Sequence, residues 1–326
     1  MLPLSADAGP DQWVESDQVF GLEQRFAVPA FRECSAHAPE LDPHYQFQPE
    51  ALRALLSGFT HGRRVLLSGL HGMGKSTHVE QVAARLNWPC LRLSLDGHLS
   101  RVDLLGRDTV VLDEGRPVTR FQEGLLPWAL RRPVALILDE YDAGRPDVMF
   151  VLQRVLEANG KLTLLDRNEV IEPHPYFRIF ATANTVGLGD ATGLYAGTQQ
   201  MNHAQLDRWD LVVSMEDMDP KAEREMVLAR HPEWREPARQ TQLRRMVELA
   251  QATRWAFRAG ELSTLMTPRT VLSWAENTRF FDDDFGTAFR LSFWNRCDEG
   301  DRSVLAELYQ RYFDQELVQG EDEQGA

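Results

Sequence analysis

Residues 65–76 read Val-Leu-Leu-Ser-Gly-Leu-His-Gly-Met-Gly-Lys-Ser, and they give the clearest indication of the fold class. From Gly69 to Ser76 it fits the pattern G-x-x-x-x-G-K-[ST] without a mismatch. The apolar run before the pattern predicts a buried strand, and the apolar residues after it recur at helical spacing: Val79, Val82, Ala83 and Leu86. A chance glycine turn is the alternative, but strand, loop and helix occur in the order that a phosphate-binding loop requires.

In such a loop the glycines let backbone N–H groups surround phosphate oxygens, and the helix N-terminus adds its dipole. Lys75 is predicted to reach the β- and γ-phosphates, and Ser76 to bind Mg²⁺. The predicted nucleotide-binding residues are Gly69, His71, Gly72, Met73, Gly74, Lys75, Ser76 and Thr77.

Two later apolar runs end in polar residues suited to phosphate chemistry. Leu136 to Leu138 is followed by Asp139 and Glu140. We expect Asp139 to hold Mg²⁺ through water and Glu140 to act as the base that polarises the attacking water. Asn184 ends the run that begins at Phe180 and is expected to orient that water. A solvated strand end and a turn-forming asparagine are the alternatives.

The rest of the chain predicts an α/β fold. Strand-like runs at 90–93, 134–138, 177–181 and 211–213 alternate with helical patterns, which indicates a parallel sheet covered on both faces. Thr109 to Arg120 and Lys161 to Ile171 interrupt the alternation as expected hairpins. After about residue 216 only helical patterns remain.

This pattern divides the 326 residues into a two-domain chain with extensions. Residues 1–48 are expected to form an N-terminal arm, loose over 1–20 and without a clear period over 21–48, that wraps over the next domain. Residues 49–215 form the predicted αβα core, 216–319 a helical lid, and 320–326 a disordered tail.

Composition and charge argue against several classes of protein. Lys and Arg total 35 against 49 Asp and Glu, so the net charge of −14 disfavours a protein held to nucleic acid by a broad basic surface. No run approaches the roughly 20 apolar residues of a membrane span, and the first residues lack a signal-peptide pattern. Three separated cysteines predict neither a disulfide framework nor a zinc site. We expect a cytoplasmic protein.

At this point the chain resembles the AAA+ ATPases, in the branch with a helix-2 insert and a pre-sensor insert, where the two expected hairpins belong. Asn184 matches sensor 1, the stretch 206–209 (Leu-Asp-Arg-Trp) resembles the arginine-finger stretch, and 267–269 (Thr-Pro-Arg) resembles the sensor-2 motif. The resemblance implies ATP as the bound nucleotide and ATP hydrolysis. It further implies that Arg208 serves the nucleotide of a neighbouring subunit, and that Arg269 acts from the lid. A solvated surface arginine is the alternative at both positions.

A narrower resemblance is carried by five stretches, at 28–31, 72–78, 139–150, 182–190 and 193–200. They are similar to the CobS family, the AAA+ subunits of aerobic cobaltochelatases, from about Val19 to beyond Arg208. Met73 departs from the threonine expected in many relatives, but its backbone N–H remains available to phosphate.

The narrower resemblance implies ATP hydrolysis coupled to insertion of Co²⁺ into hydrogenobyrinic acid a,c-diamide, in aerobic cobalamin biosynthesis. It implies a homo- or hetero-oligomeric ring, expected to be a hexamer, together with a CobT-like von Willebrand A subunit and a CobN-like large chelatase subunit. The sequence itself has no Cys or His cluster with metal-ligand spacing and no D-x-S-x-S signature. We expect His71 and His78 to pack or hydrogen-bond rather than to bind cobalt.

Three alternative functions remain open at this point. A MoxR-type remodelling ATPase that matures another metalloenzyme would have the same hydrolytic site. Only the similarity over 139–200 favours the cobaltochelatase function over this alternative. A McrB- or MCM-type nucleic-acid motor is disfavoured by the net charge. A scaffold that binds nucleotide without hydrolysing it is disfavoured by the presence of both Glu140 and Asn184.

Overall fold

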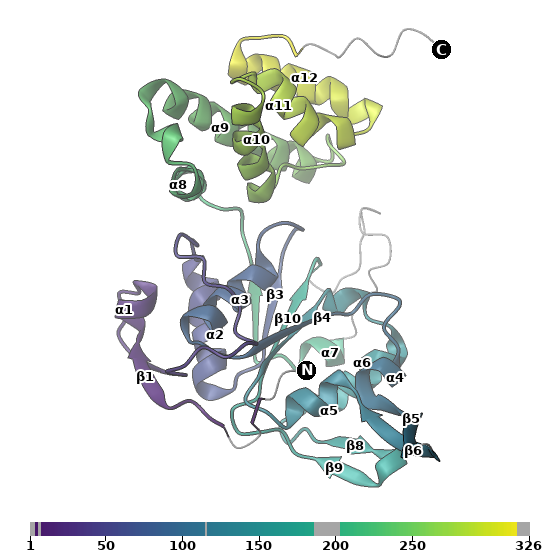
Figure 1. Ribbon diagram of the computed structural model, residues 1–326. Coiled ribbons are helices and arrows are strands. Elements are labelled where there is room, and N and C mark those ends of the chain that lie inside the picture. Colours follow the sequence, from purple (N-terminus) through teal and green to yellow (C-terminus); the bar gives the residue numbers. More distant parts are fainter. Residues whose placement is uncertain (1–3, 6–7, 115, 186–202, 318–326) are drawn as a thin grey trace. The chain divides into compact units, whose positions relative to one another are not determined.

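The computed structural model describes residues 4–5, 8–114, 116–185 and 203–317 (Figure 1). The predicted disordered tail and the CobS-like stretch at 193–200 lie outside the described residues. The chain forms two compact units, of which the second starts at Glu216 and also takes in His44–Gln46 and His71–Met73. The finer limits of an arm, a core and a lid stay predictions. Within the described residues no helix is long and apolar enough to cross a membrane.

The first unit is built on a five-stranded sheet in which every neighbouring pair is parallel. Its strands, in spatial order, are β11 (Leu211–Ser214), β3 (Val65–Ser68), β10 (Arg178–Ala183), β7 (Ala135–Asp139) and β4 (Cys90–Ser94). The sheet confirms the predicted α/β class, and each predicted strand is present. Because the strands are parallel, the residues that follow β3, β7 and β10 share one edge of the sheet.

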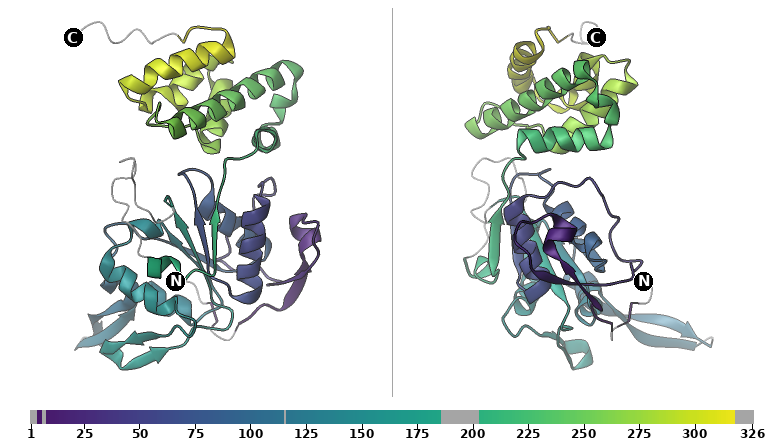
Figure 2. Two further views of the ribbon diagram at one scale, coloured as in Figure 1. Left: turned by 180° about the vertical axis from the view of Figure 1, so that it is seen from behind. Right: turned by 90° about the vertical axis from the view of Figure 1, so that its left-hand side faces the viewer.

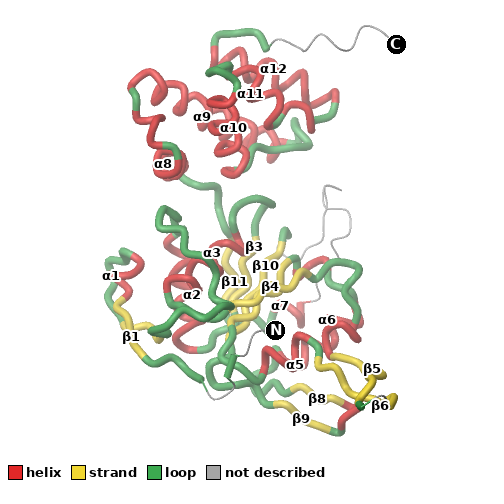
Figure 3. Tube along the Cα trace, in the orientation of Figure 1, coloured by secondary structure: helices red, strands yellow, loops and turns green. Residues whose placement is uncertain are grey.

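Helices cover both faces of this sheet, as the colours of Figure 3 show. Val65 and Leu67 point to the face covered by α2 (Pro49–His61) and α3 (Lys75–Arg85), and Leu66 points to the opposite face. The opposite face is covered by α4 (Arg101–Leu105), α5 (Leu125–Leu130) and α6 (Pro146–Val155). Burial on both faces explains why β3 reads as a continuous apolar run.

Both predicted hairpins are present in the first unit. β5 (Gly106–Asp113) pairs with β6 (Arg116–Glu123), and this hairpin projects from the unit in the right-hand view of Figure 2. β8 (Leu162–Leu164) pairs with β9 (Glu169–Ile171). Each pair is antiparallel and forms its own two-stranded sheet.

The prediction of a loose N-terminal arm was wrong. β1 (Gln12–Glu15) and β2 (Ala27–Ala30) form an antiparallel pair, with α1 (Ser16–Phe20) between them. Pro29 lies inside β2, where a proline normally argues against a strand, and each strand has only four residues. The expected packing over the core does occur, because Val28 is buried in the same apolar cluster as α2.

The second unit is helical, as predicted. Its helices are α8 (Pro220–Arg230), α9 (Pro237–Ala259), α10 (Pro268–Phe280), α11 (Phe285–Ser292) and α12 (Glu299–Phe313). Trp274, Phe289, Tyr309 and Phe313 pack together in its core, with Tyr309 and Phe313 stacked at 4.7 Å between ring centroids.

A buried ion pair joins α8 and α9. The Arg254 guanidinium donates two hydrogen bonds to the Glu223 carboxylate, at 2.6 and 2.9 Å, and a third to the carbonyl of Met266 at 2.7 Å. Both charged side chains are fully buried. Removal of one partner would leave the other as an uncompensated buried charge.

We therefore expect Arg254→Ala to lower the free energy of unfolding by about 3–5 kcal/mol. Arg244→Ala is the matched control in the same helix, because its pair with Glu248 is exposed, and should cost less than about 1 kcal/mol. Denaturant unfolding of the whole chain measures both values. Equal losses of unfolding free energy in the two variants would show that the buried pair contributes no more to stability than the exposed pair.

Candidate active site

The predicted phosphate-binding loop leads from β3 into α3. Gly69 has φ of 149°, and a Cβ there would lie 2.9 Å from the carbonyl oxygen of Met215. Gly74 has φ of 81° and caps the start of α3. Side chains are disfavoured at both positions, which accounts for the spacing of these two glycines. Lys75 and Ser76 are the first two residues of the helix, and both are buried.

The Lys75 ammonium group is held by three oxygen atoms. Its Nζ donates to the carbonyls of Gly69 and Leu70, at 2.7 and 3.0 Å, and to Oδ1 of Asn184 at 2.9 Å. Burial lowers the pKa of Lys75 to about 8, although the nearby Asp142, Asp139 and Glu140 act in the opposite direction. The structure thus brings together Lys75 and Asn184, which sequence reasoning assigned to one site.

Ser76 and Asp139 also meet, at the carboxyl edge of the sheet. Ser76 Oγ donates to Oδ1 of Asp139 at 2.5 Å, and Thr182 Oγ1 donates to the same oxygen. Burial alone would raise the pKa of Asp139, but hydrogen bonds from Ser76, Thr182 and Arg92 lower it. An ionised carboxylate beside a hydroxyl offers the hard oxygen ligands that Mg²⁺ takes, so these residues fit the predicted metal.

Glu140 follows directly, with its side chain exposed and its backbone in the left-handed region at φ of 57°. Its backbone N–H donates to Thr182 Oγ1 at 3.2 Å, which fixes the turn. Its carboxylate accepts one long hydrogen bond, 3.4 Å from Ser94 Oγ. A carboxylate held this loosely is available to take a proton from water.

Sequence reasoning missed three residues of this group. Arg92 of β4 donates to Oδ2 of Asp139 through Nε, at 2.8 Å, and through Nη2. Asp142 accepts hydrogen bonds at 2.9 Å from the backbone N–H groups of Asn184 and Thr185 and therefore orients the asparagine. Thr182 contacts both acids, as described above. Thr182 and Asp142 lie inside the CobS-like stretches, which was the available signal, whereas no pattern in the sequence indicated Arg92.

His78 has the structural role expected of it. Its Nε2 accepts a hydrogen bond from the Gln48 backbone N–H at 2.9 Å, so the ring proton lies on Nδ1, 3.3 Å from the Gly74 carbonyl. Burial lowers the pKa of His78 to about 4, and the ring is therefore neutral. Among the residues that the structure describes, no group of three or more His, Cys, Asp or Glu is placed to hold a metal ion.

The two predicted arginines lie on different units. Arg208 follows the short helix α7 (His203–Leu206), and its Nη1 donates to the Ala204 carbonyl. The next residue, Trp209, is buried edge-on against Tyr141, with ring centroids 5.2 Å apart. Arg269 is the second residue of α10 and is exposed. The roles of both arginines stay predictions.

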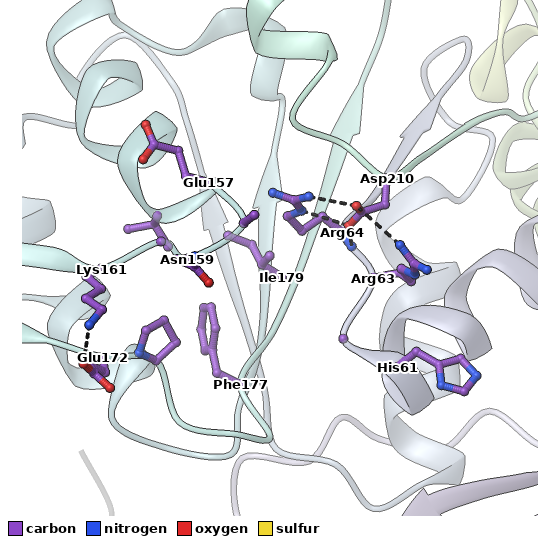
Figure 4. A pocket seen from close by; sticks show the side chains of 15 residues that line it. His61, Arg63, Arg64, Glu157, Asn159, Lys161, Glu172, Phe177, Ile179 and Asp210 are labelled. Carbon is purple, nitrogen blue, oxygen red and sulfur yellow. Dashed lines mark hydrogen bonds and ion pairs between the residues drawn. The ribbon is translucent and has the colours of Figure 1, made fainter.

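A separate cavity of 890 Å³ lies at the opposite, amino-terminal edge of the sheet (Figure 4). Its lining includes Arg63, Arg64, Lys161, Phe177 and Asp210. These residues lie just before the strands β3, β8, β10 and β11. It contains none of the residues assigned to phosphate or water above. We therefore do not assign this cavity as the active site, despite its volume.

Comparison with known proteins identifies the family of this chain. The AAA domain of the dynein-related subfamily matches residues 64–222. Over 308 residues the chain is 54% identical to the aerobic cobaltochelatase subunit CobS of a Sinorhizobium species, covering 94% of this chain and 92% of that protein. Protein CbbQ of Hydrogenophilus thermoluteolus is 31% identical over 144 residues, which cover 44% of this chain and 52% of that protein.

Among solved structures, the Holliday junction branch migration motor RuvB of Thermotoga maritima superposes with a TM-score of 0.45. The match has 14% identity and covers 80% of this chain and 67% of that chain. The similarity to CobS, in contrast, spans nearly the full length of both proteins. The chain belongs to the CobS family of aerobic cobaltochelatase subunits.

Proposed function

We propose that this chain is the ATP-hydrolysing subunit of a cobaltochelatase and drives insertion of Co²⁺ into hydrogenobyrinic acid a,c-diamide in aerobic cobalamin biosynthesis. The observation that carries the proposal is the 54% identity to CobS over 94% of the chain. The convergence of Lys75, Ser76, Asp139 and Asn184 on one edge of the sheet supports it, because these side chains provide what hydrolysis of a phosphoanhydride needs.

Each residue has a distinct role in the proposed reaction. The loop backbone and Lys75 bind the phosphates of ATP. Ser76 and Asp139 would hold Mg²⁺, which when bound neutralises phosphate charge. Glu140 takes the proton of the attacking water, and Asn184 orients that water from its position beside Lys75.

Arg208 is proposed to complete the site of a neighbouring subunit. It donates a hydrogen bond to the Ala204 carbonyl of the preceding helix α7 and is partly exposed, which is compatible with action on a second chain. We propose a ring, expected to be hexameric, in which Arg269 of the helical unit acts as sensor 2. CobT-like and CobN-like proteins are the proposed partners, with cobalt insertion itself on the CobN-like subunit.

We expect the purified chain to hydrolyse ATP slowly and to insert no cobalt by itself. Insertion should appear only when CobT-like and CobN-like proteins are added with ATP, because this chain supplies hydrolysis and not the tetrapyrrole site. Absorbance of the cobalt-containing product measures the outcome, and the same mixture with Lys75→Ala is the control.

Cobalt insertion by the single chain would contradict this division of labour. Stimulation by another metalloenzyme, with none by the two chelatase proteins, would favour the MoxR-type alternative. Strong, salt-dependent stimulation by DNA would favour a nucleic-acid motor, which the net charge of −14 opposes.

A further inference from the structure

The segment that carries Arg208 is held at Asp210 by Arg64, an arginine from a distant part of the sequence. Arg64, which immediately precedes β3, donates to Oδ2 of Asp210 from its backbone N–H at 2.8 Å and from Nε at 2.9 Å. Its Nη2 donates to Oδ1 at 2.8 Å. Figure 4 shows this pair at the rim of the cavity described above. Three hydrogen bonds, two of them from a charged group, fix the Asp210 carboxylate in one orientation.

Arg64 is itself fixed by a second element. Its Nη1 donates to the carbonyl of Leu156, the C-cap residue that directly follows α6. The backbone N–H of Leu211 donates to the carbonyl of Arg64 at 3.1 Å, so the two segments are also joined just after Asp210. The guanidinium thus connects the end of α6 to the segment between α7 and β11.

Arg208 lies two residues before Asp210, and the residue between them is Trp209, which is packed against Tyr141. The backbone that carries Arg208 is therefore anchored through a buried ring and an ion pair. A purely structural reading is that Arg64 and Asp210 only attach β11 to the sheet. However, β11 already pairs with β3 in register from Leu211 to Ser214, and Asp210 lies outside that ladder.

We propose that Arg64 is a positioning residue for the arginine finger: its bonds to Asp210 fix the segment from which Arg208 reaches the nucleotide of a neighbouring subunit. This inference depends on the proposed function of Arg208. Its physical basis is that a charged group acts on a transition state only from a well-defined position, and a displacement of about 1 Å can cost roughly 10²-fold in rate.

A mixed assembly separates positioning from folding. A Lys75→Ala chain can supply only the finger, and an Arg208→Ala chain can supply only the phosphate loop, so a mixture of the two restores some complete sites. We expect Arg64→Ala in the finger donor to reduce the recovered ATP hydrolysis by roughly 10²-fold. The same Arg64→Ala in the loop donor should change the recovery less than twofold, because that chain no longer has a finger to position.

Arg63→Ala is the matched control, because Arg63 precedes Arg64, is largely exposed and lies 3.8 Å from the same Asp210 carboxylate. In the finger donor it should leave the recovery unchanged, whereas Asp210→Asn there should reproduce the loss caused by Arg64→Ala.

Equal losses in both placements of Arg64→Ala would overturn the proposal, since the pair would then serve the fold of each chain. No loss in either placement would overturn it as well. No recovery from the starting mixture would refute the finger assignment itself, a failure distinct from the other two.

Discussion

A Glu140→Gln variant should bind ATP as tightly as the parent chain and hydrolyse it about 10²–10⁴-fold more slowly. The amide has nearly the same shape as the carboxylate, so the turn fixed by the Glu140–Thr182 hydrogen bond is retained. An amide oxygen, however, cannot take a proton from water at neutral pH. Because Glu140 is exposed and only weakly bonded to Ser94, its replacement should break no strong hydrogen bond of the site.

Equilibrium binding of a fluorescent ATP analogue and steady-state phosphate release separate the two properties. Lys75→Ala should show the opposite defect, weak binding of ATP, because it removes the cation that we propose to bind the phosphates. Asp147→Asn, which removes another exposed carboxylate near the start of α6, serves as the control and should behave like the parent. Parental turnover in Glu140→Gln would show that the base is another residue.

Arg208→Ala should bind ATP normally and lose about 10³–10⁵-fold in the rate of hydrolysis. The guanidinium of a finger neutralises charge that develops on the phosphate only in the transition state, so it contributes to rate and not to binding. Its present hydrogen bond, to the Ala204 carbonyl of the preceding helix α7, is easily exchanged for one to a phosphate.

Mixing Arg208→Ala chains with Lys75→Ala chains tests whether the finger acts between subunits. Each variant alone should be nearly inactive, whereas the mixture should recover part of the parental rate. Arg224→Ala, an arginine on α8 of the helical unit, is a suitable control for general loss of positive charge. If cross-linking shows mixed assemblies and no activity returns, Arg208 acts within its own chain or has no role in the reaction.

Local patterns were sufficient to predict most of the fold and several residues that the structure brings together at the candidate site. The phosphate-binding loop, the apolar strand before Asp139 and the strand before Asn184 are each continuous in sequence. Parallel pairing then places their carboxyl ends at one edge of the sheet. The family resemblance added the expectation for Arg208, which no local pattern distinguishes from a surface arginine.

The interactions that were not predicted depend on contacts between distant segments. Arg92 occupies a strand position that reads as an ordinary polar residue, and only the neighbouring strand β7 brings Asp139 to it. Arg64 and Asp210 are separated by 146 residues and meet because β3 and β11 are neighbours in the sheet. Similarly, β1 and β2 are too short to be recognised without the pairing that joins them.

The backbone conformation of Glu140 has a consequence for the evolution of this chain. A left-handed conformation costs a residue with a side chain about 1 kcal/mol relative to glycine. Glycine at position 140 would relieve this strain, so the most stable form of the turn is one without a base. Random mutation screened for thermostability alone would therefore tend to enrich inactive chains at this position, and a combined screen for turnover would be needed to retain the acid.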